Sequence, residues 1–105
     1  MRHLRVVTVA DHFWVCALDA RDLPLDWRRE HHAHDAFQPC GAYDSVGALA
    51  LQLARRLGVG YSSQDWVVAG SNVYFLDLNP GGQWLFLPEP VSSEVTAAIA
   101  VWLAG

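Results

Sequence analysis

The sequence contains no lysine, and all seven of its basic residues are arginines. Within these 105 residues, no lysine can therefore hold a phosphate group or form a Schiff base. Long apolar runs are also missing, since no stretch approaches the roughly 18 residues that a membrane-spanning helix needs. Residues 1–13 include an acidic residue and no small-residue cleavage site, so they do not indicate a signal peptide. We therefore expect a cytoplasmic protein with no membrane partner.

Cysteine is scarce, and charge of one sign is not concentrated anywhere. The spacing of Cys16 and Cys40 fits neither a disulfide framework nor a structural metal site, and both are predicted to be reduced thiols, with Cys16 in a strand core. The net charge is −4, and there is no basic run and no heptad pattern. These features argue against a general nucleic-acid-binding protein and against a coiled coil.

The first half of the chain predicts a hairpin and a long loop. Two β-branched runs, 4–10 and 13–20, predict strands joined by a tight turn at Asp11-His12. Residues 21–42 contain prolines and charges without a clean period, which predicts a loop. Loops of this length are uncommon in a compact domain, and they are usually functional or disordered.

A helix is predicted next, with Asp44 or Ser45 as its N-cap and Gly58 just after its end. Its apolar stripe consists of Val46, Leu49, Ala50, Leu53 and Leu57.

Two further strands, 62–68 and 72–79, precede a last helix that is expected to start near Ser92 or Ser93. The inner face of that helix is predicted to comprise Val95, Ile99, Trp102 and Leu103. The order β-β-α-β-β-α predicts an α+β fold, with two helices packed on an antiparallel sheet. With 52% hydrophobic residues, the chain can bury the core of one domain over residues 1–105.

Three polar residues in the second strand pair carry the strongest chemical signal. Side chains alternate along a strand, so Asp77 and Asn79 share one face, and Asp65 lies on the preceding strand. A two-residue turn would put the two aspartates on opposite faces. A three-residue loop at 69–71, or a β-bulge, would bring them to one face, with Asp65 opposite Phe75 and Asp77 on the diagonal. We therefore predict an odd-numbered loop or a bulge.

Two carboxylates and an amide oxygen on one sheet face suit Mg²⁺, which takes a few protein oxygens and completes its octahedron with phosphate and water. The alternative interpretation of the same spacing is an edge strand whose polar side chains face water.

The order of four segments resembles a known family. Residues 64–80, QDWVVAGSNVYFLDLNP, are similar to the strand pair of ATP-grasp ligases in which an Asp precedes an LE(V/L)NP motif. The similarity to the ATP-grasp ribosomal peptide maturases of the microviridin or graspetide type covers nearly the whole chain. It is carried by LRVVTVADHFWVCALDA at 4–20, LDWRR at 25–29, ARRLGVGYSSQDWVV at 54–68 and NPGGQWLF at 79–86.

The resemblance implies the C-terminal subdomain of the ATP-grasp fold, with ATP and Mg²⁺ as cofactors. Asp65, Asp77 and Asn79 would hold Mg²⁺ against the nucleotide phosphates. Arg5 and Arg28 would contact the γ-phosphate and the acyl-phosphate formed from it. The implied partner is a precursor peptide, whose side-chain carboxylate is phosphorylated and then captured by a hydroxyl or an amine. The product is a macrocyclic ester or amide, as in the biosynthesis of ribosomally synthesised and post-translationally modified peptides (RiPPs).

The sequence also departs from the family pattern. Asp77 stands where the family usually has Glu, and no segment matches the parts that hold the adenine pocket and the phosphate-binding lysines. We therefore expect a C-terminal portion that is inactive alone, as a truncated gene or a separately encoded piece. The alternative is a non-catalytic module that binds a peptide, complements a separate ATP-grasp half or forms a homo-oligomer.

A third, unrelated interpretation concerns the histidine-rich run HHAHD at 31–35. Together with Cys40 it could form a zinc site, although the spacing matches no structural zinc pattern. The other interpretation of this run is a solvated loop.

Overall fold

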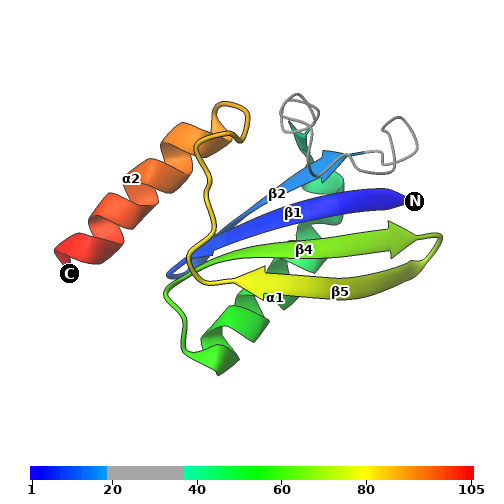
Figure 1. Cartoon of the computed structure of the whole chain (residues 1–105), viewed down its shortest axis with the longest axis horizontal. Helices are drawn as coiled ribbons and strands as arrows, with labels where there is room; N and C mark the ends of the chain where they lie inside the picture. The colour runs from blue at the N-terminus through cyan, green and yellow to red at the C-terminus, as the bar shows by residue number, and fades with distance from the viewer. Residues whose placement is uncertain (19–36) are drawn as a thin grey trace.

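A five-stranded antiparallel sheet with the order β3-β2-β1-β4-β5 forms the centre of the part of the chain that is described (Figure 1). The computed structural model describes residues 1–18 and 37–105. Its strands are β1 (Arg2–Val9), β2 (His12–Leu18), β3 (Gln38–Pro39), β4 (Tyr61–Ala69) and β5 (Asn72–Asn79). A 3₁₀ turn, η4 (Gly41–Tyr43), leads into α1 (Asp44–Leu57), and α2 (Val91–Ala104) comes last. The predicted α+β fold is confirmed.

One strand was not predicted. Gln38 and Pro39 fall in the segment expected to be a loop, yet they pair with Ala17 and Cys16 and form the edge strand β3. The sequence gives no signal for this strand because it is very short and contains a proline, which a sheet tolerates at its edge.

The two helices cover opposite faces of the sheet. On one face, α1 packs on the cluster Leu4, Val6, Val15, Ala17, Val46, Ala50 and Trp66. On the other face, α2 and the segment before it pack on Val7, Val9, Cys16, Leu18, Phe37, Tyr61, Leu87, Val91 and Val95. In Figure 1, α1 crosses behind the strands, whereas α2 lies beside the end of the sheet. The central strand β1 is consequently buried on both faces.

The buried face of α1 differs from the predicted stripe. Val46 and Ala50 are buried as expected, but Leu49 and Leu57 are 49% and 58% exposed. Small residues make the close contact instead, because a Cβ on Gly47 would lie 2.2 Å from the Phe13 ring. Among the leucines of the predicted stripe, Leu53 packs against this cluster and is half-buried.

The predicted helix ends were partly wrong. Neither Asp44 nor Ser45 is the N-cap of α1: Tyr43 occupies that position and makes no capping hydrogen bond with its side chain. Gly58 has a φ of 72° and ends the helix as predicted. The helix α2 starts one residue early, at Val91, where the carboxylate of Glu89 accepts hydrogen bonds from Ser92 and Ser93.

The predicted inner face of α2 is also too long. Val95 is fully buried and Ile99 is half-buried, whereas Trp102 is 42% exposed and Leu103 is 73% exposed. The helix extends beyond the end of the sheet, so its last turns have little to pack against. No helix in residues 1–18 and 37–105 has the length and apolarity required to cross a membrane.

The first hairpin turns one residue earlier than predicted. Val9 pairs with His12, so the turn is Ala10-Asp11, and Ala10 has a φ of 51°. The predicted strand cores are otherwise correct. Cys16 is buried without a disulfide, and burial raises the pKa of its thiol to about 11, despite the opposing charge of Arg5. It is therefore a protonated thiol at neutral pH, and its predicted place in a strand core is confirmed.

A buried polar network joins β4 to α1. Gln64, which is fully buried, donates from Nε2 to the Ala50 carbonyl at 2.8 Å and to Ser62 Oγ at 3.1 Å. Its Oε1 accepts the indole N–H of Trp66 at 2.9 Å, and Ser62 contacts Thr8 Oγ1 at 2.6 Å. Each polar group here has a partner, which buried polar groups require.

Replacing Gln64 with Ala should lower the free energy of unfolding by about 2–4 kcal/mol, since it leaves a cavity and deprives the buried indole N–H of Trp66 of its acceptor. Urea unfolding followed by far-UV circular dichroism measures this change. The exposed Gln52 on α1 provides the control, and Gln52→Ala should stay within about 0.5 kcal/mol of the native protein. Equal losses in both variants would show that the network contributes nothing specific.

Candidate functional site

A β-bulge brings the two candidate aspartates together. The β4–β5 hairpin has a two-residue turn, with Ala69 opposite Asn72, and the register then shifts between Trp66 and Asp65. Trp66 pairs with Phe75, but Asp65 pairs with Asp77, so Leu76 is the extra residue of the bulge. The predicted bulge is confirmed, and the three-residue loop is not observed. The predicted diagonal arrangement of the two aspartates is wrong, because Asp65 and Asp77 are direct cross-strand partners.

The site forms a row of side chains across four strands. Arg5 on β1 lies opposite Cys16 on β2 and opposite Asp65 on β4, which in turn lies opposite Asp77 on β5. Directly paired residues share a sheet face, so all four are on the face that carries α2. Asn79 is on the same face, two residues further along β5. Of the five predicted site residues, the sheet therefore brings together four: Arg5, Asp65, Asp77 and Asn79.

The strongest contact in this row is the ion pair between Arg5 and Asp65. The Arg5 Nε donates to Asp65 Oδ1 at 2.7 Å, and both side chains are less than one-fifth exposed. Arg5 Cζ also lies 5.7 Å from the Phe37 ring centroid and 5.5 Å from that of Phe86. These aromatic rings limit the access of water to the guanidinium and hold it over the sheet.

His3 adds a second contact to the same carboxylate, with its Nε2 3.3 Å from Asp65 Oδ1. Sequence reasoning missed His3 because it placed the strand start at Leu4. A strand that begins at Arg2 puts His3 on the face of Arg5, and this alternation was the available signal.

The ionisation of Asp65 follows from these contacts. Burial alone raises the pKa of this carboxyl, but the hydrogen bond from His3 and the charge and hydrogen bond of Arg5 outweigh burial. The net effect lowers the pKa below its ordinary value of 3.8, so Asp65 is a carboxylate at neutral pH.

The end of β5 is fixed by a tight turn. Asn79 Oδ1 accepts the Gly81 N–H at 2.8 Å, and the Tyr61 hydroxyl donates to the Gly82 carbonyl at 2.5 Å. A Cβ on Gly82 would lie 2.8 Å from Ser63 Cβ, so only glycine lets the chain cross the sheet this closely. The turn holds Asn79 beside the aspartates, and its Oδ1 retains a second lone pair.

The donor set fits Mg²⁺ with bound phosphate rather than a closed metal cage. The contacts to Asp65 converge on Oδ1 and leave Oδ2, while Asp77 and Asn79 are exposed. Within the described ranges, no three His, Cys, Asp or Glu side chains form a metal cluster. Mg²⁺ is commonly held by one or two carboxylates while phosphates and water supply its other ligands, and the amide oxygen of Asn79 adds a further neutral oxygen here.

Two of the sequence-based expectations lie outside the described residues. Arg28 falls within 19–36, and so does the histidine-rich run 31–35 of the zinc interpretation. The remaining member of that interpretation, Cys40, is half-buried and forms no disulfide.

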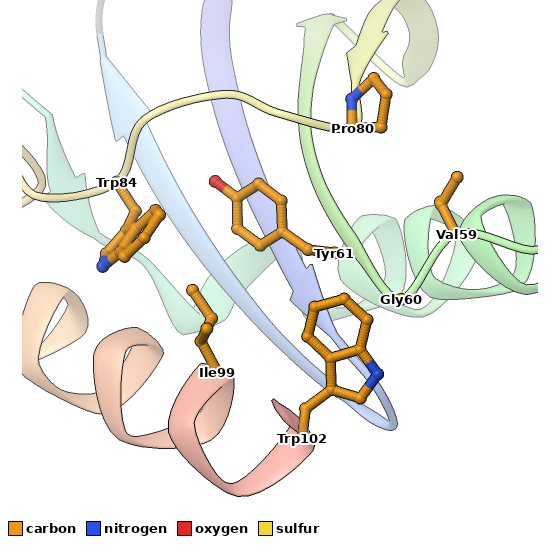
Figure 2. A pocket seen from close by; sticks show the side chains of 7 residues that line it. All are labelled: Val59, Gly60, Tyr61, Pro80, Trp84, Ile99 and Trp102. Atoms are coloured by element: carbon orange, nitrogen blue, oxygen red, sulfur yellow. The ribbon is translucent and has the colours of Figure 1, made fainter. Parts of the chain in front are cut away.

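An apolar pocket of about 360 Å³ opens beside the turn that follows Asn79. Figure 2 shows Tyr61 and Trp84 on one side and Trp102 and Ile99, both from α2, on another. Its remaining lining residues are Val59, Gly60 and Pro80. Gly60 lets the Trp102 indole lie close to the backbone here, since a Cβ would lie 2.0 Å from it. The pocket is thus one residue away from a candidate ligand, Asn79, which precedes Pro80.

No family model and no curated protein matches this sequence, but several solved structures have a similar fold. A RiPP-associated ATP-grasp ligase from Chryseobacterium gregarium, solved with ADP and a leader and core peptide, has a TM-score of 0.81 over 98% of this chain at 21% identity. Its low identity supports the fold alone.

Two macrocyclases from Microcystis aeruginosa are similar at higher identity. MdnC, solved with the precursor peptide MdnA, has a TM-score of 0.75 over 99% of this chain at 25% identity. MdnB has a TM-score of 0.72 over 97% of this chain at 26% identity. The chain has the fold of RiPP-associated ATP-grasp ligases. It spans only about a third of their length, since it covers 33%, 33% and 36% of the three chains.

Because of the Arg5–Asp65 ion pair, we expect the free energy of unfolding to depend on pH. A carboxyl whose pKa is lowered by folding contributes stability that is complete above its ordinary pKa of 3.8 and is lost as the pH falls through the folded value. Asp65→Asn should therefore lower the unfolding free energy by about 1–3 kcal/mol at pH 7, and the difference from native should shrink as the pH falls below 3.8. Urea unfolding at a series of pH values measures this.

Asp11→Asn is the control, because Asp11 pairs with Arg55 on the exposed surface, where ion pairs contribute little. A difference between the native protein and Asp65→Asn that stays constant from pH 7 to pH 2 would contradict the prediction.

Proposed function

We propose that this chain forms the Mg²⁺–nucleotide-binding part of an ATP-dependent ligase that activates peptide carboxylates. The observation that carries the proposal is the pairing of Asp65 with Asp77 across the bulge, with Arg5 in the same row. The fold likeness to RiPP-associated ATP-grasp ligases supports it, since one of those structures contains ADP and two contain peptides.

In the proposed reaction, an oxygen of a precursor-peptide carboxylate attacks the γ-phosphorus of ATP, and the bond to the β–γ bridging oxygen breaks to release ADP. A hydroxyl or amine of the same peptide then attacks the acyl carbon. Phosphate leaves, the nucleophile loses its proton, and a macrocyclic ester or amide closes.

Each residue of the candidate site has a physical role in this scheme. Bound Mg²⁺ would supply charge neutralisation between phosphate oxygens. Asp65, Asp77 and Asn79 would hold it through one oxygen each. Arg5 uses Nε for Asp65, which leaves its Nη groups to hold a transferring phosphoryl group. The rings of Phe37 and Phe86 lower the local dielectric around that guanidinium and strengthen its hold on phosphate. Arg28 remains a proposed second phosphate contact.

Calorimetry tests the nucleotide site directly. The native chain is expected to bind Mg²⁺–ATP, and Asp77→Ala should weaken binding at least about tenfold because the site then has one carboxylate instead of two. Asp77 is exposed, so this substitution should leave the fold unchanged. Asp11→Ala, which removes an exposed carboxylate on the β1–β2 turn, is the control and should bind as the native chain does. Equal binding by native and Asp77→Ala would exclude Asp77 as a ligand.

The apolar surface favours a second candidate function, a module that binds a peptide or complements a separate half. The pocket at Tyr61, Trp84 and Trp102 takes apolar groups. Val101 and Leu103 at the end of α2 and Tyr74 and Leu76 on the edge strand β5 are also strongly exposed. Exposed apolar patches of this kind mark association sites. In this function, ATP binding is not required.

A small aromatic amide tests the pocket. N-acetyl-phenylalaninamide should bind with about millimolar affinity and shift the NMR signals of the Gly60 amide and of the Trp84 and Trp102 indole N–H groups. Ile99→Gln places a polar group in the lining and should weaken binding, whereas Val101→Gln, outside this pocket, should not. Shifts spread evenly over the surface, or equal in both variants, would argue against a peptide-binding pocket.

A further inference from the structure

Of the two histidines in the described residues, His3 is the one at the candidate site. Its side chain is 5% exposed, and its Nε2 lies 3.3 Å from Asp65 Oδ1. The ring also packs edge-on against Phe37, with 5.9 Å between centroids. His12, by contrast, lies exposed at the start of β2. The burial of His3 and its contact with Phe37 give its ring a fixed position.

Both donors act on the same oxygen of Asp65. Arg5 Nε and His3 Nε2 approach Oδ1 from two residues on one face of β1. A carboxylate held by two donors on one oxygen cannot rotate freely about its side-chain bonds. Its Oδ2 is therefore left in a fixed place on the face that carries Asp77.

We propose that His3 is a positioning residue that holds Asp65 in the orientation required for metal binding. This inference rests on the proposed function, because it assigns His3 a role at the same Mg²⁺–nucleotide site. Partners that hydrogen-bond to a ligating carboxylate orient it, and their removal commonly costs 10–100-fold in metal affinity.

A second donor is needed because Arg5 has two tasks in this site. Its Nε holds Asp65 while its Nη groups are left for the phosphoryl group, so Arg5 contributes a single hydrogen bond to the carboxylate. His3 adds a second donor on Oδ1, and its ring packs against Phe37 and does not itself reach for the phosphate in the proposed scheme.

The test compares metal binding in variants that remove or retain the donor. Mn²⁺ favours the same oxygen ligands as Mg²⁺ and replaces it in this test. The protein is titrated into Mn²⁺ and ADP, and the concentration of free Mn²⁺ is measured by electron paramagnetic resonance. His3→Met fills similar space without a donor and should bind Mn²⁺ 10–100-fold more weakly. His3→Gln keeps an N–H near the position of Nε2 and should restore affinity to within about threefold of native.

His12→Met is the matched control and should bind as the native chain does. Thermal melting of every variant separates positioning from stability. A structural role alone would lower the melting temperature of His3→Met and His3→Gln without changing Mn²⁺ affinity, and that result would overturn the inference.

The same titration distinguishes the inference from the function on which it rests. If the native chain binds Mn²⁺–ADP and Asp65→Asn does not, but His3→Met binds normally, only the positioning role of His3 is wrong. If the native chain does not bind Mn²⁺–ADP, or if Asp65→Asn binds as tightly as native, the proposed metal site itself is wrong.

A measurement on the unmutated chain covers the case in which His3→Met does not fold. The ¹⁵N spectrum of the imidazole nitrogens reports which one carries the proton. The inference requires a proton on Nε2 of His3, because only then can Nε2 donate to Asp65. A neutral ring protonated on Nδ1 would overturn it.

Discussion

The β-bulge at Leu76 is the constraint on which the candidate site depends. Side chains alternate along a strand, so a regular β5 paired through a two-residue turn would direct Asp77 and Asn79 toward the α1 face. That face holds the buried Gln64 and Trp66, so Asp77 and Asn79 would then lie on the opposite side of the sheet from Arg5 and Asp65. The extra residue lets Phe75 pack near Trp66 while Asp77 reaches the face of Arg5, so one strand serves both the core and the site.

Charge balance is the second condition for this arrangement. Asp65 and Asp77 are direct cross-strand neighbours, and two carboxylates in such a position repel each other. Arg5 compensates Asp65, and the aromatic rings of Phe37 and Phe86 limit the access of water to that pair. Asp77 has no such partner among the described contacts and lies exposed at the sheet edge. The site is thus charged unevenly, with a compensated carboxylate in the interior and an open one at the rim, as expected where a cation and phosphates meet a protein.

Exposed apolar residues on β5 and α2 lie close to the charged candidate site. The second half of α2, residues 97–104, is apolar on every side, and a helix of that kind is normally buried, yet the buried residues of α2 are Val91 and Val95 in its first turns. The pocket between Trp84 and Trp102 lies where this helix leaves the sheet (Figure 2). In the function proposed above, nucleotide and peptide would bind to adjacent parts of one face, joined by the turn at Asn79 and Pro80.

The sequence by itself determined the order of the main elements, the buried Cys16 and the left-handed Gly58, because apolar periodicity and glycine preference are local properties of the chain. It also indicated that Asp65, Asp77 and Asn79 could share a face only with an odd loop or a bulge. It could not decide between these, since the bulge depends on how β5 packs against β4.

Only the tertiary structure showed that His3 contacts Asp65, 62 residues later in the chain, and that small residues rather than leucines bring α1 onto the sheet. It also identified the short strand β3, which exists only because β2 offers an edge. Such contacts depend on the register between distant strands, and local sequence patterns do not encode that register.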